Sequence, residues 1–146
     1  MMPISKMVGK PGIYLDTSGV LAFFDASDVH HESACRAWES ISAMQSEIIL
    51  TDYVRLECWS LLQRRLGMEA AEDFLGKILP ICRFEPVGEK GFELLSRQAI
   101  LSQRRKLSLV DFSSFDCMHR LGIKRAVAFD RHFDEQGFIT PNSAEW

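Results

Sequence analysis

Short apolar runs and stretches with helical spacing alternate along the chain. Three apolar runs, at residues 13–15, 48–50 and 126–129, predict buried β-strands, because they are short, apolar and bounded by turn-forming or polar residues. A fourth strand is expected at residues 81–84. Thr17-Ser18-Gly19, directly after the first run, is expected to form a turn.

Between these runs, apolar residues recur three or four positions apart, which predicts amphipathic helices. The first is expected from Asp28 as N-cap and the second from Thr51 to Gly67, with others over residues 71–78, 92–99 and 108–121. Alternating strands and helices predict an α/β fold with a parallel sheet covered by helices. A length of 146 residues predicts one domain, residues 1–146.

The net charge limits how the protein can attract a polyanion. The 17 Lys and Arg against 20 Asp and Glu give a net charge of −3, so the chain has no overall positive field. Two short basic clusters, Arg104-Arg105-Lys106 and Arg64-Arg65, can neutralise a phosphate locally or can simply be solvated helix ends.

Cysteine spacing and hydropathy exclude several other classes. The four cysteines contain no C-x-x-C pair, so neither a zinc site nor a disulfide framework is indicated. The stretch Met1–Pro11 has no apolar run of signal-peptide length, and no segment has the roughly 20 apolar residues of a membrane span. We therefore expect a cytoplasmic protein with no membrane contact.

Four acidic residues are set apart by their placement. Asp16 and Asp130 follow apolar strands, Glu57 borders the apolar stripe of a predicted helix, and Asp111 stands three residues after Ser108. Each has a structural explanation: an Asx turn for either strand-end aspartate, a flanking position for Glu57, and a capping box for Asp111.

A cluster of these four acids would need a counter-charge. Carboxylates ~4 Å apart repel by about 4 kcal/mol at an effective dielectric near 20, so such a cluster implies protonation or a bound cation. With oxygen ligands and no His or Cys at metal-binding spacing, the cation would be Mg²⁺ or Mn²⁺.

Four short motifs resemble those of the PIN-domain family in identity and in order. The resemblance is to the VapC-type ribonuclease toxins of toxin–antitoxin pairs, and it extends from Ile13 to Phe138. The motifs are Ile13-Tyr14-Leu15-Asp16-Thr17-Ser18, Leu56-Glu57, Ser108-Leu109-Val110-Asp111 and Ala128-Phe129-Asp130-Arg131-His132-Phe133.

This resemblance implies a three-layer α/β/α fold around a mainly parallel sheet, and a metal-dependent endoribonuclease. It implies one catalytic and metal-binding site made of Asp16, Glu57, Asp111 and Asp130. Thr17 or Ser18 would assist through a hydroxyl or a backbone amide. Hydrolysis would leave 3′-hydroxyl and 5′-phosphate ends. The implied partners are RNA, a second copy of the chain, and a small antitoxin that presents an arginine to the acids.

Alternative readings turn on a few residues. Asp116 is an extra acid but does not share a helical face with Asp111, so we place it outside the site. Arg131 and His132 either touch RNA or act as a solvated cation and a polar cap. A haloacid-dehalogenase phosphohydrolase would need a second acid where Ser18 stands, and a receiver domain would need a lysine where Arg131 and His132 stand.

A PIN-like module that binds RNA or protein without cutting is the main alternative.

Overall fold

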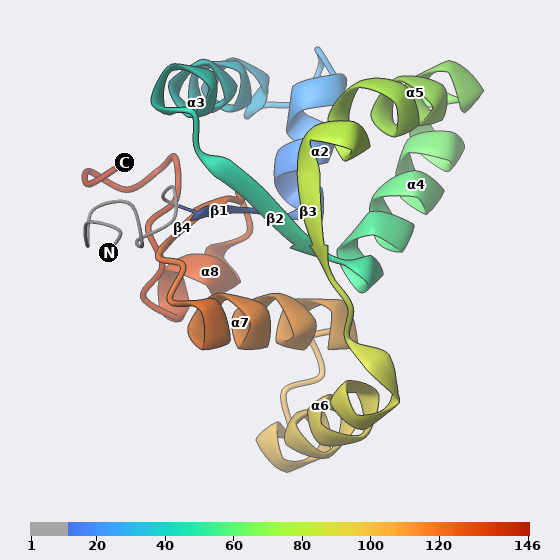
Figure 1. The fold of residues 1–146 in the computed structure, drawn as a ribbon, viewed down its shortest axis with the longest axis vertical. Coiled ribbons are helices and arrows are strands. Elements are labelled where there is room, and N and C mark those ends of the chain that lie inside the picture. Colours follow the sequence, from blue (N-terminus) through green and yellow to red (C-terminus); the bar gives the residue numbers. More distant parts are fainter. Residues whose placement is uncertain (1–11) are drawn as a thin grey trace, which may run out of the picture.

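Four parallel strands form the centre of the molecule. The computed structural model describes residues 12–146, so the expectation for Met1–Pro11 lies outside the described residues. The sheet has the order β3-β2-β1-β4 (Figure 1). Its strands are β1 (Gly12–Leu15), β2 (Glu47–Thr51), β3 (Cys82–Glu85) and β4 (Arg125–Val127). In the register, Tyr14 lies opposite Ile49 on one side and Ala126 on the other.

Helices cover both faces of this sheet, so the predicted three-layer α/β/α fold is confirmed (Figure 1). One group consists of α2 (Thr17–Phe24), α3 (His31–Met44), α4 (Asp52–Leu66) and α5 (Met68–Asp73). The other consists of α6 (Gly88–Ser102), α7 (Leu109–Leu121) and α8 (Arg131–Glu135). A π-helical turn (Phe74–Ile78) and a 3₁₀ turn (Leu79–Ile81) lead from α5 into β3.

The core is continuous from one helical layer to the other, because the strands are buried on both faces. Tyr14 and Leu50 are fully buried, as are Met118 and Phe133 on the α7 and α8 side. Parallel strands with helices on both faces have this apolar character.

Several predicted helix ends are confirmed by their caps. The Thr51 side chain accepts a hydrogen bond from the backbone N–H of Val54 at the start of α4, and Gly67 ends that helix. Ser108 and Asp111 form a reciprocal capping box at the start of α7, which ends at Gly122.

Other local predictions were wrong. Thr17 begins helix α2 rather than a turn, because Asp16 serves as its N-cap. Helix α3 begins at His31, and Asp28 instead accepts a hydrogen bond from the backbone N–H of His30 in the preceding turn. Strand β4 ends at Val127, two residues earlier than expected.

The start of α2 depends on one glycine. A Cβ at Gly19 would lie 2.2 Å from the carbonyl oxygen of Val127, so only glycine allows α2 to approach β4 this closely. This approach brings the residue that caps α2 close to the end of β4.

All four cysteines are free thiols. Within residues 12–146, no helix has both the length and the apolar character to cross a bilayer.

Candidate active site

Three of the four acids lie on segments that follow strands at the carboxyl edge of the sheet. Asp16 follows β1, which lies between β2 and β4. Strand β2 leads directly into α4, which carries Glu57, and β4 is followed closely by Asp130, the N-cap of α8. Because the chain leaves β1 toward β2 and later returns to its other side at β4, this edge is a topological switch point, where α/β proteins place their sites.

Helix α7, which carries Asp111, is tied to the same edge by buried hydroxyl groups. The Tyr14 hydroxyl of β1 donates to the Ser114 Oγ at 2.7 Å. The Thr51 Oγ1, at the junction of β2 and α4, lies 3.0 Å from the Ser113 Oγ. Because these two bonds join α7 to the strands that precede Asp16 and Glu57, they fix three acid-bearing segments relative to one another.

The segment before Asp130 is tied to α2 in the same way. The backbone N–H of Asp16 donates to the Val127 carbonyl at 3.2 Å. The backbone N–H of Phe129 donates to the Ser18 Oγ at 2.9 Å. These contacts join the segment that leads to Asp130 to the start of α2, which follows Asp16 directly.

The Asp16 carboxylate is buried, with 5% of the residue exposed, and is held through one oxygen only. Its Oδ2 accepts hydrogen bonds from the Ser18 backbone N–H at 3.0 Å and the Ser18 Oγ at 2.6 Å. Of the two hydroxyl residues expected to assist, Ser18 therefore contacts this carboxylate, whereas the Thr17 hydroxyl accepts from the Cys58 thiol. No hydrogen bond from the described residues reaches Oδ1, which leaves that oxygen available to a ligand.

Asp111 and Asp130 repeat this arrangement. The Asp111 Oδ2 accepts from the Ser108 backbone N–H at 3.0 Å and from its hydroxyl at 3.2 Å. The Asp130 Oδ1 accepts from the His132 backbone N–H at 3.0 Å. In residues 12–146 the other oxygen of each carboxylate receives no hydrogen bond, so the caps orient these side chains without satisfying them.

Electrostatic repulsion links the four acids. The pKa of Asp16 is raised from 3.8 to about 6, mainly by burial and further by the charges of Asp111 and Glu57, although the Ser18 hydrogen bonds oppose the rise. The pKa of Asp111 is also raised, first by burial and then by the charge of Asp130. Each acid therefore lies within electrostatic range of at least one other, which is the condition that a cation relieves.

The donor set suits a hard cation, but it is not a closed cage. Among residues 12–146, no three His, Cys, Asp or Glu side chains lie close enough together to form a metal-binding group. Mg²⁺ commonly uses only one or two carboxylates and keeps several waters. The free oxygens of Asp16, Asp111 and Asp130 and the half-buried side chain of Glu57 fit that mode of binding.

The neighbouring polar residues have distinct partners. His132 is buried, with its Nδ1 3.4 Å from the Glu135 Oε2 and its Nε2 3.8 Å from the Asp130 Oδ1. Arg131 points to Glu135 at 3.7 Å. The sequence reasoning missed Glu135, although its spacing of four residues from Arg131 is a usual sign of a helical ion pair.

Asp116 lies elsewhere on α7. Its Oδ2 accepts from the Arg120 Nε at 2.8 Å, and it lines a separate cavity of about 240 Å³ between α6 and α7. No described contact links it to the four acids.

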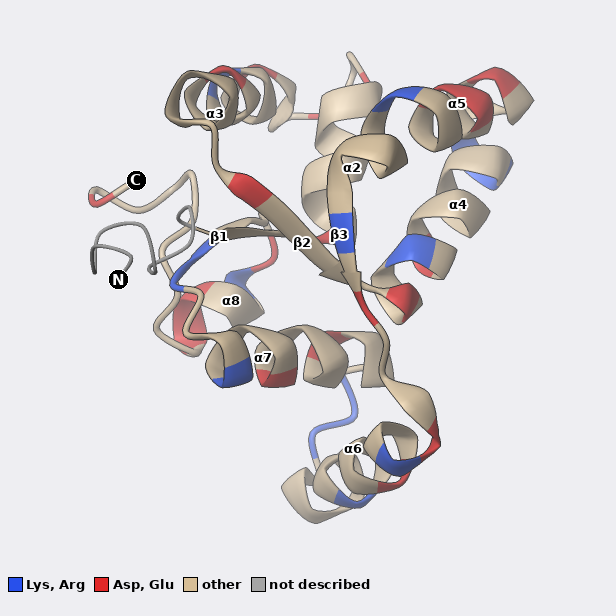
Figure 2. Cartoon of the chain, viewed as in Figure 1, with Lys and Arg blue, Asp and Glu red and all other residues tan. Residues whose placement is uncertain are grey.

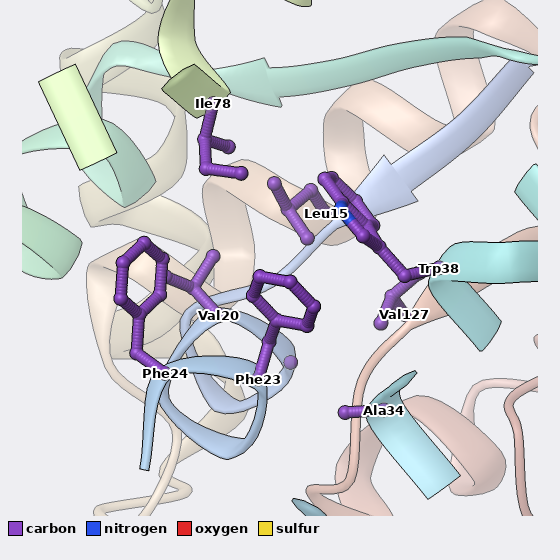
Figure 3. Close-up of a pocket in the computed structure, with 9 residues that line it drawn as sticks. Leu15, Val20, Phe23, Phe24, Ala34, Trp38, Ile78 and Val127 are labelled. Atoms are coloured by element: carbon purple, nitrogen blue, oxygen red, sulfur yellow. The ribbon is translucent and has the colours of Figure 1, made fainter. Parts of the chain in front are cut away.

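A narrow crevice under α2 is apolar and has no groups for chemistry. It has a volume of about 10 Å³, at the lower limit for one water molecule, and Figure 3 shows that its lining side chains are apolar apart from the indole nitrogen of Trp38. The labelled side chains are Leu15, Val20, Phe23, Phe24, Ala34, Trp38, Ile78 and Val127. This crevice is a packing gap in the core rather than a site.

Known proteins are similar to this chain in sequence and in fold. The family model for the PIN domain matches residues 13–139, which include all four acids. The 23S rRNA-specific endonuclease VapC20 of Mycobacterium tuberculosis, from strains CDC 1551 / Oshkosh and ATCC 25618 / H37Rv, is 34% identical over 132 residues, covering 87% of this chain and 95% of VapC20. The crystal structure of M. tuberculosis VapC20, described as a sarcin-ricin loop cleaving toxin, aligns with a TM-score of 0.76 and 32% identity, covering 87% of this chain and 96% of that chain.

Proposed function

The chain belongs to the PIN-domain family, and from this membership and the arrangement of its acids we propose that it is a metal-dependent endoribonuclease acting as the toxin of a toxin–antitoxin pair. VapC20 is named for its action on 23S rRNA, so a structured loop of ribosomal RNA is the first substrate class to test. Asp16, Glu57, Asp111 and Asp130 are the proposed metal-binding and catalytic residues.

One observation carries this proposal. Asp16 is buried at the carboxyl edge of β1, its charge is opposed by Asp111 and Glu57, and one of its oxygens has no protein partner among residues 12–146. A group of that kind is costly to keep ionised unless a cation binds beside it. A module that only held RNA would gain nothing from this arrangement.

The roles of the side chains follow from their contacts. When bound, Mg²⁺ or Mn²⁺ would activate water and stabilise charge on the phosphoryl oxygens. Ser18 and Ser108 hold one oxygen of Asp16 and of Asp111, so the other oxygen of each carboxylate would be free to bind the cation. Glu57 has no side-chain hydrogen bond among residues 12–146, so it is free to bind through water or to accept the proton of the attacking water.

The proposal extends to partners and location. We expect a cytoplasmic homodimer and a small antitoxin whose arginine reaches the four acids, since a guanidinium pairs strongly with carboxylates. A short reading frame next to this one should encode that antitoxin. Expression of the chain alone should arrest growth, and co-expression of the antitoxin should relieve the arrest.

The direct test is cleavage of RNA by the purified chain. We expect cuts that require Mg²⁺ or Mn²⁺, stop with EDTA, and yield 3′-hydroxyl and 5′-phosphate ends when the products are sequenced. Asp16→Asn should abolish cleavage while the fold stays intact by circular dichroism. Asp116→Asn is the matched control, because it removes an acid from α7, the helix that carries Asp111, but outside the four-acid set, and it should leave cleavage unchanged.

The non-catalytic alternative predicts a different result. RNA or a protein partner would bind with similar affinity to the wild type and to Asp16→Asn, and neither protein would cut. Cleavage that persists in EDTA, or in the Asp16→Asn variant, would contradict the metal-dependent reading.

A further inference from the structure

Positive charge is concentrated in one connection of this acidic protein. Arg104, Arg105 and Lys106 are consecutive and exposed, and Figure 2 shows them on the connection between α6 and α7. Within residues 12–146, neither Arg105 nor Lys106 forms an ion pair, whereas Arg104 does. Two cations therefore remain available to an anionic partner.

The connection is held in a defined conformation. Leu107 is buried, and its backbone N–H donates to the Arg104 carbonyl at 3.2 Å, which closes a turn. Gln103 ends α6 in the left-handed conformation. Because both ends of this basic turn (residues 104–106) are fixed, little conformational freedom is left to lose when it binds a partner.

An ion pair attaches the basic turn to the candidate active site. The Arg104 Nη2 lies 3.0 Å from the Glu135 Oε2 on α8. The same carboxylate is the partner of His132, whose other ring nitrogen faces Asp130. On its other side, the turn is followed within two residues by Ser108, which caps α7 and holds Asp111. The basic turn therefore lies between the segments that carry two of the four acids.

We propose that the basic turn is a phosphate-contact site for the RNA substrate, with Arg105 and Lys106 binding backbone phosphates next to the scissile bond and Arg104 holding the turn in place. The inference rests on the proposed function, because it names how the same site receives its substrate.

Charge complementarity favours RNA as the partner. The four acids repel a polyanion, and the net charge of −3 gives no general attraction, so binding requires local cations at the edge of the site. Arg105 and Lys106 are placed to supply them. Arg131, exposed on α8 and paired like Arg104 with Glu135, adds a third positive group.

The test measures RNA binding without cleavage. Fluorescence anisotropy with a fluorescein-labelled single-stranded RNA, in EDTA and over a range of KCl concentrations, gives the affinity and its salt dependence. A plot of the logarithm of the association constant against the logarithm of the salt concentration has a negative slope. The variant Arg105→Ala/Lys106→Ala should make this slope shallower by about 1.4 and weaken binding about 10-fold or more near 0.1 M salt.

A control variant and a conservative variant isolate the position from the charge. Arg64→Ala/Arg65→Ala removes the same charge from the last turn of α4, where both residues are exposed. It should change the slope by much less. The exchange Arg105→Lys/Lys106→Arg should keep the wild-type slope. Thermal melting of each variant checks that the fold is intact.

The outcomes separate the two proposals. Equal slopes for the wild type and for Arg105→Ala/Lys106→Ala, or equal losses in both double variants, would overturn the phosphate-contact site even if the protein cleaves RNA. The same titration with labelled poly-glutamate tests for an acidic peptide as the partner. If Arg105→Ala/Lys106→Ala loses poly-glutamate binding but keeps RNA binding, the phosphate-contact site is also overturned, because the turn would then recognise an acidic peptide. Absence of cleavage would refute the proposed function, but the RNA-binding measurement could still be interpreted, because it does not depend on cleavage.

Discussion

Replacing Asp16 with asparagine should stabilise the metal-free protein at neutral pH. Asparagine keeps an oxygen that can accept both Ser18 hydrogen bonds, but it removes a charge that is buried and repelled by Asp111 and Glu57. If Asp16 is a cation ligand, as proposed, its carboxylate should destabilise the metal-free fold in this way.

The magnitude follows from the pKa of Asp16. In the folded protein this pKa is about 6, against an ordinary value of 3.8. The difference corresponds to about 3 kcal/mol, because a pKa difference of one is worth about 1.4 kcal/mol. Well below pH 3.8 the carboxyl is protonated in both states, and the folded state has its full stability. As the pH rises from 3.8 through about 6, the unfolded chain releases its proton first, and the folded state loses stability until its own carboxyl is ionised.

Urea unfolding in EDTA at pH 4 and pH 8 measures this effect. The free energy of unfolding of Asp16→Asn minus that of the wild type should rise by about 2.5 kcal/mol between the two pH values, because a small part of the effect is already present at pH 4. At pH 8 the variant should melt about 10 °C higher than the wild type. Added Mg²⁺ should stabilise the wild type more than the variant, because ligand binding to the folded state adds stability.

Asp25 offers a matched control. Its Oδ1 accepts the same pair of bonds, from the Ser27 backbone N–H at 2.9 Å and hydroxyl at 2.6 Å, but the group is exposed and its pKa is lowered by these bonds. Asp25→Asn should therefore show no gain in stability from pH 4 to pH 8. A pH-independent difference for Asp16→Asn, or a loss of stability at pH 8, would refute the reasoning.

Two further predictions concern the supports of the site, and urea unfolding measures both. Gly19→Ala should lower the free energy of unfolding by about 2 kcal/mol or more, because the new Cβ would meet the Val127 carbonyl oxygen at 2.2 Å. Gly76→Ala is the control: a Cβ there meets no atom within 4 Å, so the change should be neutral or slightly stabilising. Tyr14→Phe should cost about 1 kcal/mol, because it removes the 2.7 Å hydrogen bond to Ser114 from the core. No loss of stability in Gly19→Ala would mean that α2 can move away from β4, and a neutral Tyr14→Phe would mean that the hydroxyl network does not hold α7.

Much of the fold could be predicted from local patterns. The strand that ends before Asp16, the helix start at Thr51 and the capping box at Ser108 were predicted, because apolar runs and capping side chains act within a few residues. The turn expected at Thr17 was wrong for a tertiary reason. Small residues at this position favour a turn when only the local sequence is considered. The structure needs glycine at position 19 for a different reason, because α2 passes close to Val127, and no local pattern encodes that contact.

The candidate site was only partly accessible to sequence reasoning. The position of Asp111 in a capping box at a helix start could be predicted, since a cap lies next to the residues it binds, whereas Asp16 was predicted to follow a strand but not to begin a helix. The burial of Asp16, and its repulsion by acids far away in the chain, depend on how the strands order themselves in the sheet. The contact between Glu135 and Arg104 was not predicted, because the two residues are 31 positions apart in the sequence.

Metal binding by the acids is the central claim, and an anomalous diffraction measurement on crystals soaked in Mn²⁺ tests it most directly. We predict a manganese peak at coordination distance, about 2.1 Å, from an oxygen of Asp16, with at least one of Glu57, Asp111 and Asp130 bound directly or through water. No peak at the carboxyl edge of β1 under saturating Mn²⁺, or a peak bound only by other residues, would contradict the account.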